Sequence, residues 1–332
     1  MSLPPMPPGG GDQVWPDPSG DSNRRRWIIV GLSFAAVVAL VVGLLVWQSR
    51  SGGDGSGAPS ADGGVDRTVG LLTEKDPVCD DWIKYADELA EETREWDAID
   101  KTISAAGWSP EQRDIVERAA DAMRSAADQF ESILPMANDV ALQELIAQTI
   151  VYWRAFVDRV PNYVRADSML AGTAGNFGSA ATFMCTAVPI ILGRDLISEA
   201  VPASSETPAQ LSAFIRDTEP SCNELTALMD RQDRILRGWS DGDPSKRASE
   251  WSADERRLNQ AAIPVLVEDG KRAVAIAQTS TNPVLADLVQ TYVAYMNAFA
   301  DALPTYEPDD HQLWKVATFL GGGLGAACEA QL

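Results

Sequence analysis

Histidine is almost absent from this sequence, because His311 is the single one among 332 residues. With one histidine, the chain cannot form a metal site from several imidazoles, and any catalytic Ser/His/Asp set would have to use His311. His311 follows Glu307 and Pro308 in a turn-like stretch, which predicts a solvated side chain. The glycine-rich run 321–325 lacks the lysine of a phosphate-binding loop and predicts close helix packing instead. We expect no catalytic residue, no metal site and no cofactor, and therefore no enzyme.

Basic residues are also scarce, with 27 Lys and Arg against 48 Asp and Glu, for a net charge of -21. A nucleic-acid partner is excluded on this ground, since binding phosphates needs patches of Lys and Arg. Direct binding of the protein surface to anionic lipid headgroups is disfavoured for the same reason. Only seven of the acidic residues lie before residue 76, so the acid belongs to the globular part, where it favours solubility.

Charge is missing altogether from residues 27–47, a run of 21 residues with Trp27 and Trp47 at its ends. A helix of this length spans about 30 Å, the thickness of a bilayer core, and tryptophan suits the two interfaces. The basic triplet 24–26 precedes the run, and only Arg50 follows closely. The positive-inside rule then places the N-terminus in the cytoplasm and the C-terminal part outside. The alternative is a cleaved signal peptide, but the run is longer than a typical signal core and begins after a 26-residue tail.

One face of this predicted transmembrane helix carries only small residues, namely Gly31, Ala35, Ala39 and Gly43. Small residues at four-residue spacing let a second helix approach closely. The face predicts contact with a membrane-protein partner or a homo-oligomer. The alternative is that Gly and Ala are simply common in membrane helices.

The segments on either side of the span have the composition of unstructured chain. Residues 1–26 are rich in Pro and Gly and are expected to be a disordered cytoplasmic tail. Residues 48–75 are rich in Gly, Ser, Asp and Ala and are expected to be a flexible linker.

The rest of the chain is predicted to be a tandem repeat, because landmark residues recur 143 positions apart without a gap. The recurring residues include all four cysteines and four of the ten tryptophans. Examples are Pro77/Pro220, Cys79/Cys222, Trp96/Trp239, Trp108/Trp251, Tyr152/Tyr295, Asp158/Asp301, Tyr163/Tyr306 and Cys185/Cys328. We therefore divide this part into repeat 1 (76–190), a connector (191–218) with a short helix near 207–217, and repeat 2 (219–332).

Apolar residues at three- and four-residue steps predict helices throughout each repeat, so the fold class is all-α. The sequence 109–112 is a helix start with a capping Ser, a following Pro and Gln112 three positions on, and Pro161 should end the third helix. Helices with short turns favour a four-helix-bundle-like unit in each repeat. The uncharged stretch 168–193 is expected to be a tightly packed core helix; a second membrane span is the alternative.

Four cysteines allow three pairings. In an up-down-up-down bundle the start of the first helix meets the end of the fourth, which predicts Cys79–Cys185 and Cys222–Cys328. The repeat predicts the same pairs, and an oxidising outer compartment would preserve them. Free thiols or a metal site are the alternatives, but the C-x-x-C spacing typical of such sites is missing.

The recurring polar residues flanking the third helix are the candidates for contact with a ligand or a partner. They are Tyr152, Asp158, Tyr163, Tyr295, Asp301 and Tyr306. The structural alternative is that the aspartates cap helices. In that case Tyr163 and Tyr306 pack on the prolines two positions before them, and Tyr152 and Tyr295 belong to the core.

A Pro/Gly-rich tail, one span, a tether and an acidic helical ectodomain together resemble the uncharacterised single-pass cell-envelope proteins of mycobacteria and related actinobacteria. The resemblance implies an envelope location and no activity. The expected function is a non-enzymatic accessory or adaptor subunit of a membrane or cell-envelope complex that uses the helical ectodomain to bind protein. The alternative is an extracytoplasmic ligand-binding or sensing module, with a lipid or small molecule between helices or repeats. An envelope hydrolase is the least favoured reading.

Overall fold

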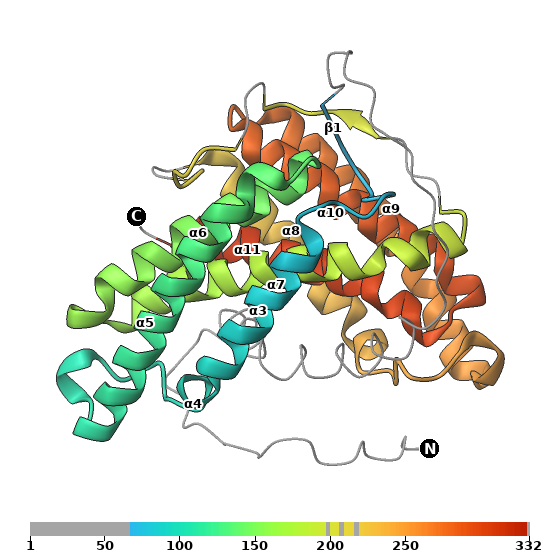
Figure 1. The fold of residues 1–332 in the computed structure, drawn as a ribbon. Coiled ribbons are helices and arrows are strands. Elements are labelled where there is room, and N and C mark those ends of the chain that lie inside the picture. Colours follow the sequence, from blue (N-terminus) through green and yellow to red (C-terminus); the bar gives the residue numbers. More distant parts are fainter. Residues whose placement is uncertain (1–66, 197–199, 206–208, 216–218, 331–332) are drawn as a thin grey trace, which may run out of the picture.

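A computed structural model describes residues 67–196, 200–205, 209–215 and 219–330 (Figure 1). The expected tail, the expected span with Gly31, Ala35, Ala39 and Gly43, and most of the expected linker lie outside these residues. The described part is mostly helical, as the apolar periodicity predicts.

The first half of the described chain is built from helices whose ends follow the predicted signals. Ser109 and Gln112 form a reciprocal capping box at the start of α5, and Asp139 accepts a hydrogen bond from the Leu142 N–H at the start of α6. Pro161 lies in a 3-10 turn directly after α6 and stops it. The first helix of this half is interrupted near Thr93, so that a short α4 follows α3. The bounds are α3 Cys79–Glu92, α4 Arg94–Asp97, α5 Pro110–Ile133, α6 Val140–Arg159 and α7 Ser168–Gly193.

The second half uses the same kinds of helix start. Ser252 and Glu255 form the capping box of α9, and the Asn282 side chain accepts a hydrogen bond from the Leu285 N–H at the start of α10. The bounds are α8 Pro220–Ser240, α9 Ala253–Thr279, α10 Pro283–Ala302 and α11 His311–Glu329. Short 3-10 helices occupy the turns: Ala105–Gly107, Leu134–Met136, Val160–Asn162, Arg165–Asp167, Ala248–Glu250, Leu303–Thr305 and Pro308–Asp310.

Within each half the helices pack in a closed ring. α5 lies between α3 and α6, and α7 packs against both α6 and α3. In the second half α9 lies between α8 and α10, and α11 packs against both α10 and α8. Figure 1 shows α3 and α5 toward one side of the molecule and the orange helices of the second half toward the other.

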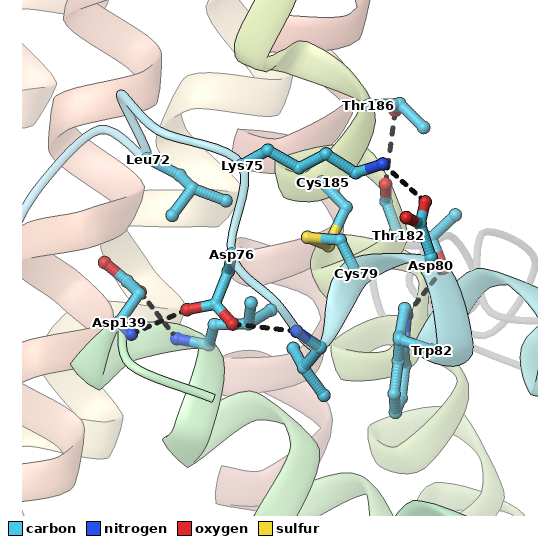
Figure 2. Close-up of a disulfide and its surroundings, with 12 residues drawn as sticks. Leu72, Lys75, Asp76, Cys79, Asp80, Trp82, Asp139, Thr182, Cys185 and Thr186 are labelled. Atoms are coloured by element: carbon cyan, nitrogen blue, oxygen red, sulfur yellow. Dashed lines mark hydrogen bonds and ion pairs between the residues drawn. A yellow bond between two sulfur atoms is a disulfide. The ribbon is translucent and has the colours of Figure 1, made fainter. Parts of the chain in front are cut away.

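Both expected disulfides are present, Cys79–Cys185 and Cys222–Cys328, each with Cα atoms 5.5 Å apart. Each joins the first helix of its half to the last, as the bundle topology predicts. Figure 2 shows the first disulfide beside Trp82, whose indole N–H donates to the Thr182 hydroxyl at 3.0 Å. The Asp76 carboxylate nearby accepts backbone N–H groups from Val78 and from Asp139, and so links this corner to the start of α6.

α7 and α11 form the most extensive helix pair in the described residues and join the two halves. They run antiparallel, because the Thr186 hydroxyl bonds Gln312 near one end while Gly323 lies against Phe177 further along. A Cβ added to Gly323 would come within 2.4 Å of the Phe177 ring, so glycine is what allows this approach. Residues 165–193 are the one described helical stretch long and apolar enough to cross a membrane, but 78% of its most apolar window is buried. This burial is consistent with the core helix that the sequence predicts for residues 168–193.

The all-α expectation misses a small β element. β1 (Thr68–Val69) pairs antiparallel with β2 (Val201–Pro202) at the top of Figure 1. The last part of the expected flexible linker is therefore packed, with the Val69 side chain 1% exposed. Residues 209–215 of the connector contain no helix, contrary to the helix expected near 207–217. Two-residue strands and short extended segments carry too little periodicity to be recognised from sequence.

Candidate functional site

Tyr163 and Tyr306 hold the turns that follow α6 and α10. The Tyr163 hydroxyl donates to the Lys101 carbonyl at 2.7 Å, and its ring stacks on Trp108. Tyr306 does the same with the carbonyl of Pro244 and the ring of Trp251. Burial raises the pKa of both phenols, that of Tyr163 to about 12. These contacts are structural, and they occupy the hydroxyls that a ligand would use.

Asp158 and Asp301 lie on the exposed sides of α6 and α10, near the ends of these helices. Neither carboxylate is brought to the buried tyrosines, so the six nominated residues do not form a single site. Both aspartates are exposed, so contact with a partner protein stays a prediction for them.

Tyr152 and Tyr295 are both fully buried, where α6 and α10 face each other. The Tyr295 hydroxyl accepts the backbone N–H of Leu72 at 3.1 Å, so the chain that enters the first half docks on the second half. The Tyr152 hydroxyl has no hydrogen-bond partner among the described residues, and its ring packs edge-on against Phe214. Burial raises the pKa of both phenols.

A buried carboxyl pair lies in the same seam between α6 and α10. Glu144 is 1% exposed and Asp287 is 0% exposed, and they stand 143 positions apart, the offset at which the landmark residues recur. The Ser205 hydroxyl lies between them, 2.8 Å from Glu144 Oε1 and 2.7 Å from Asp287 Oδ2. The sequence prediction missed this cluster. The shared offset was the available signal, but one Glu and one Asp in an acidic chain predict a solvated surface.

The pKa of Glu144 is well above its usual range, first because burial penalises the ionised form and next because the charge of Asp287 lies nearby. The Ser205 hydroxyl and the Arg67 guanidinium act in the opposite direction. Asp287 receives the backbone N–H groups of Ser204 and Ser205 at 2.6 Å and 3.0 Å. The connector therefore covers the pair, and the chemistry that this arrangement supports is the holding of a proton.

His311 is half-buried at the start of α11, contrary to the expectation of a solvated turn residue. Burial, with a smaller contribution from Lys315, lowers the pKa of its imidazole to about 4. The imidazole is therefore neutral at pH 7. Among the described residues no group of three or more His, Cys, Asp or Glu side chains is placed to hold a metal ion.

A family model described as "Mycobacterial ESX-1 associated protein" matches residues 60–332, which include all the described helices. The chain belongs to this family. It is also similar to an uncharacterised protein of Mycolicibacterium smegmatis strain MKD8, with 26% identity over 343 aligned residues that cover 95% of this chain and 89% of the relative. No solved structure matches it. The mycobacterial part of the expected resemblance is confirmed, and the family description names no enzymatic activity.

Proposed function

We propose that this protein is a non-enzymatic accessory subunit of the ESX-1 secretion system that binds another protein through its helical ectodomain. The observation that carries the proposal is the family match, which spans residues 60–332 and so includes the whole described body. The hydroxyls of Tyr163, Tyr295 and Tyr306 also support a non-enzymatic role, because each is hydrogen-bonded within the protein and stabilises the fold.

We further propose that residues 27–47 anchor the protein in the cell membrane, with the N-terminus in the cytoplasm and the helical body outside. The charge-free run of 21 residues with basic residues before it supports this orientation. The two disulfides support an outer location, since such bonds persist in oxidising compartments.

The helical body is proposed to be a tandem duplication. Contacts that recur 143 positions apart support this origin: the Ala105 N–H donates to the Tyr163 carbonyl at 2.9 Å, and the Ala248 N–H donates to the Tyr306 carbonyl at 2.8 Å. A duplicated scaffold offers two related surfaces on one rigid body. Such a scaffold is suited to bridging partners in a complex, which favours the adaptor role.

The alternative of a lipid or small molecule between the halves has less support. The α7–α11 seam is filled by side chains, with Phe183 stacked on Phe319 at 5.5 Å between ring centroids. Gly322 lies so close to Asn176 that an added Cβ would come within 2.7 Å of its amide oxygen. Close packing of this kind suits a structural interface.

Co-purification from native mycobacterial membranes tests the proposal. The tagged full-length chain, extracted in mild detergent, is expected to bring down other components of the ESX-1 system. Replacing Gly31 and Gly43 together by Ile should reduce this recovery if the small-residue face contacts a partner, because bulky side chains prevent close helix approach. Val41→Ile, away from the small-residue face, is the matched control and should leave recovery unchanged. Recovery of the tagged protein alone would contradict the proposal.

A further inference from the structure

The hydrogen bonds around Ser205 require one more proton than the ionised side chains supply. The Ser205 hydroxyl carries a single hydrogen, yet its oxygen lies within hydrogen-bond distance of both Glu144 Oε1 and Asp287 Oδ2. Both contacts are hydrogen bonds only if one carboxyl group is protonated and donates to the Ser205 oxygen. Two carboxylates would leave an oxygen facing an oxygen in a buried place, which is unfavourable.

The extra proton belongs on Glu144. Both oxygens of Asp287 already accept a backbone N–H group, Oδ1 from Ser204 and Oδ2 from Ser205. Glu144 Oε2 has no such donor among the described residues. The resulting chain runs from the Glu144 O–H to the Ser205 oxygen, and from the Ser205 O–H to Asp287 Oδ2.

This chain fastens two extended segments to the seam. Ser205 ends the connector strip, which we define as residues 201–205. Through β1–β2 pairing the strip holds the arm, defined as residues 67–72, and the Ala203 N–H donates to the Arg67 carbonyl at 2.8 Å. The arm is also the segment through which the described body joins the predicted membrane segment.

We propose that Glu144, Ser205 and Asp287 form a protonated latch that closes the connector strip and the arm onto the α6–α10 seam, and that loss of the proton opens it. Opening leaves two adjacent carboxylates beneath the strip, with one hydroxyl hydrogen between them. The proton passes to solvent, and the Glu144 O–H is the only covalent bond that breaks. The charged groups facing Glu144 are Asp287 on α10, which opposes ionisation, and Arg67 on the arm, which favours it. The latch is closed at low pH and opens as pH rises.

Hydrogen–deuterium exchange of the full-length protein in detergent tests the latch from about pH 5 to about pH 9, the range in which buried glutamates titrate. Protection of the strip and the arm should fall by up to about tenfold per pH unit between the ordinary pKa of a solvated glutamate and the raised pKa of Glu144 in the closed latch, because each opening in that range releases one proton. Above that raised pKa the fall should level off. Glu144→Gln should remain protected throughout, since its amide stays neutral and donates to Ser205. Comparing the two proteins at each pH removes the intrinsic pH dependence of exchange. Equal protection of wild type and Glu144→Gln at every pH overturns the proposal.

A second pair of variants separates the latch from general loosening. Ser205→Ala removes the bridging hydroxyl and should expose the strip at all pH values, whereas Ser204→Ala should change nothing, because only the backbone of Ser204 takes part. Unchanged exchange in Ser205→Ala contradicts the proposal. Infrared spectroscopy reports the proton directly: at about pH 6, where an ordinary glutamate is ionised, the wild-type protein should show a protonated-carboxyl band that is lost in Glu144→Gln. Identical carboxyl bands in the two proteins at that pH overturn the proposal.

Discussion

Tyr152 and Tyr295 stand 143 positions apart and are equally buried, yet only the Tyr295 hydroxyl has a hydrogen-bond partner among the described residues. Tyr295→Phe should lower the free energy of unfolding by about 1–3 kcal/mol, because it leaves the Leu72 N–H buried without an acceptor. Tyr152→Phe should be neutral or slightly stabilising. Urea unfolding of the two variants measures the difference, and equal effects would show that the Leu72 contact contributes nothing.

Glu144 sets a pH dependence of stability whose sign follows from its raised pKa. The folded protein keeps a proton that the unfolded chain releases near pH 4.5, so the free energy of unfolding falls as pH rises from there through the folded pKa. Glu144→Gln should remove this slope. Thermal unfolding of both proteins across the same pH range measures it. A slope that persists unchanged in Glu144→Gln assigns the titration to another group.

At the residue scale the sequence predicts the cysteine pairs and the capping side chains, because their roles depend on neighbours in the chain or on topology. It does not predict that Glu144 is buried. Burial of a carboxyl depends on groups that arrive from other segments, here Ser205 and Asp287. The same limit applies to His311, whose burial depends on how α11 packs.

At the scale of elements the α7–α11 pair depends on glycine at the crossing. Gly323→Ala should destabilise the protein by about 1–3 kcal/mol, because the new methyl group would overlap the Phe177 ring. Gly325→Ala is the matched control on the same helix. Its Cβ would meet only the Met229 sulfur at 3.8 Å, so the substitution should be neutral or stabilise by up to about 1 kcal/mol through helix propensity. Denaturant unfolding of both variants decides, and equal losses would contradict close packing at Gly323.

Helices are predictable here because their starts and periodicity lie within local sequence, as the capping box at Ser109 shows. The arm and the connector strip are not, since each is held by partners more than 60 positions away. Their extended backbone has its hydrogen-bond partners on α6 and α10, so its position depends on how these two helices pack. The sequence therefore gives the helical units, and the structure adds the segments that fasten them together.

At the scale of the whole molecule the two halves should unfold together, because α7 belongs both to a disulfide and to the seam with α11. Replacing Cys79 and Cys185 together by Ser should cost about 4–5 kcal/mol in the chain-entropy model for a loop of this length. It should also lower the melting temperature of the whole body. The matched variant replaces Cys222 and Cys328 and should behave alike. Calorimetry showing two separate transitions would contradict a single cooperative body.

We propose that the protein serves the ESX-1 system as an accessory subunit. Deletion of its gene from a mycobacterium with an active ESX-1 system, followed by quantification of ESX-1-dependent proteins in the culture filtrate, tests this most directly. We expect their export to fall, the wild-type chain to restore it, and the chain lacking residues 27–47 not to restore it. Normal export in the deletion strain would contradict an accessory role in the ESX-1 system.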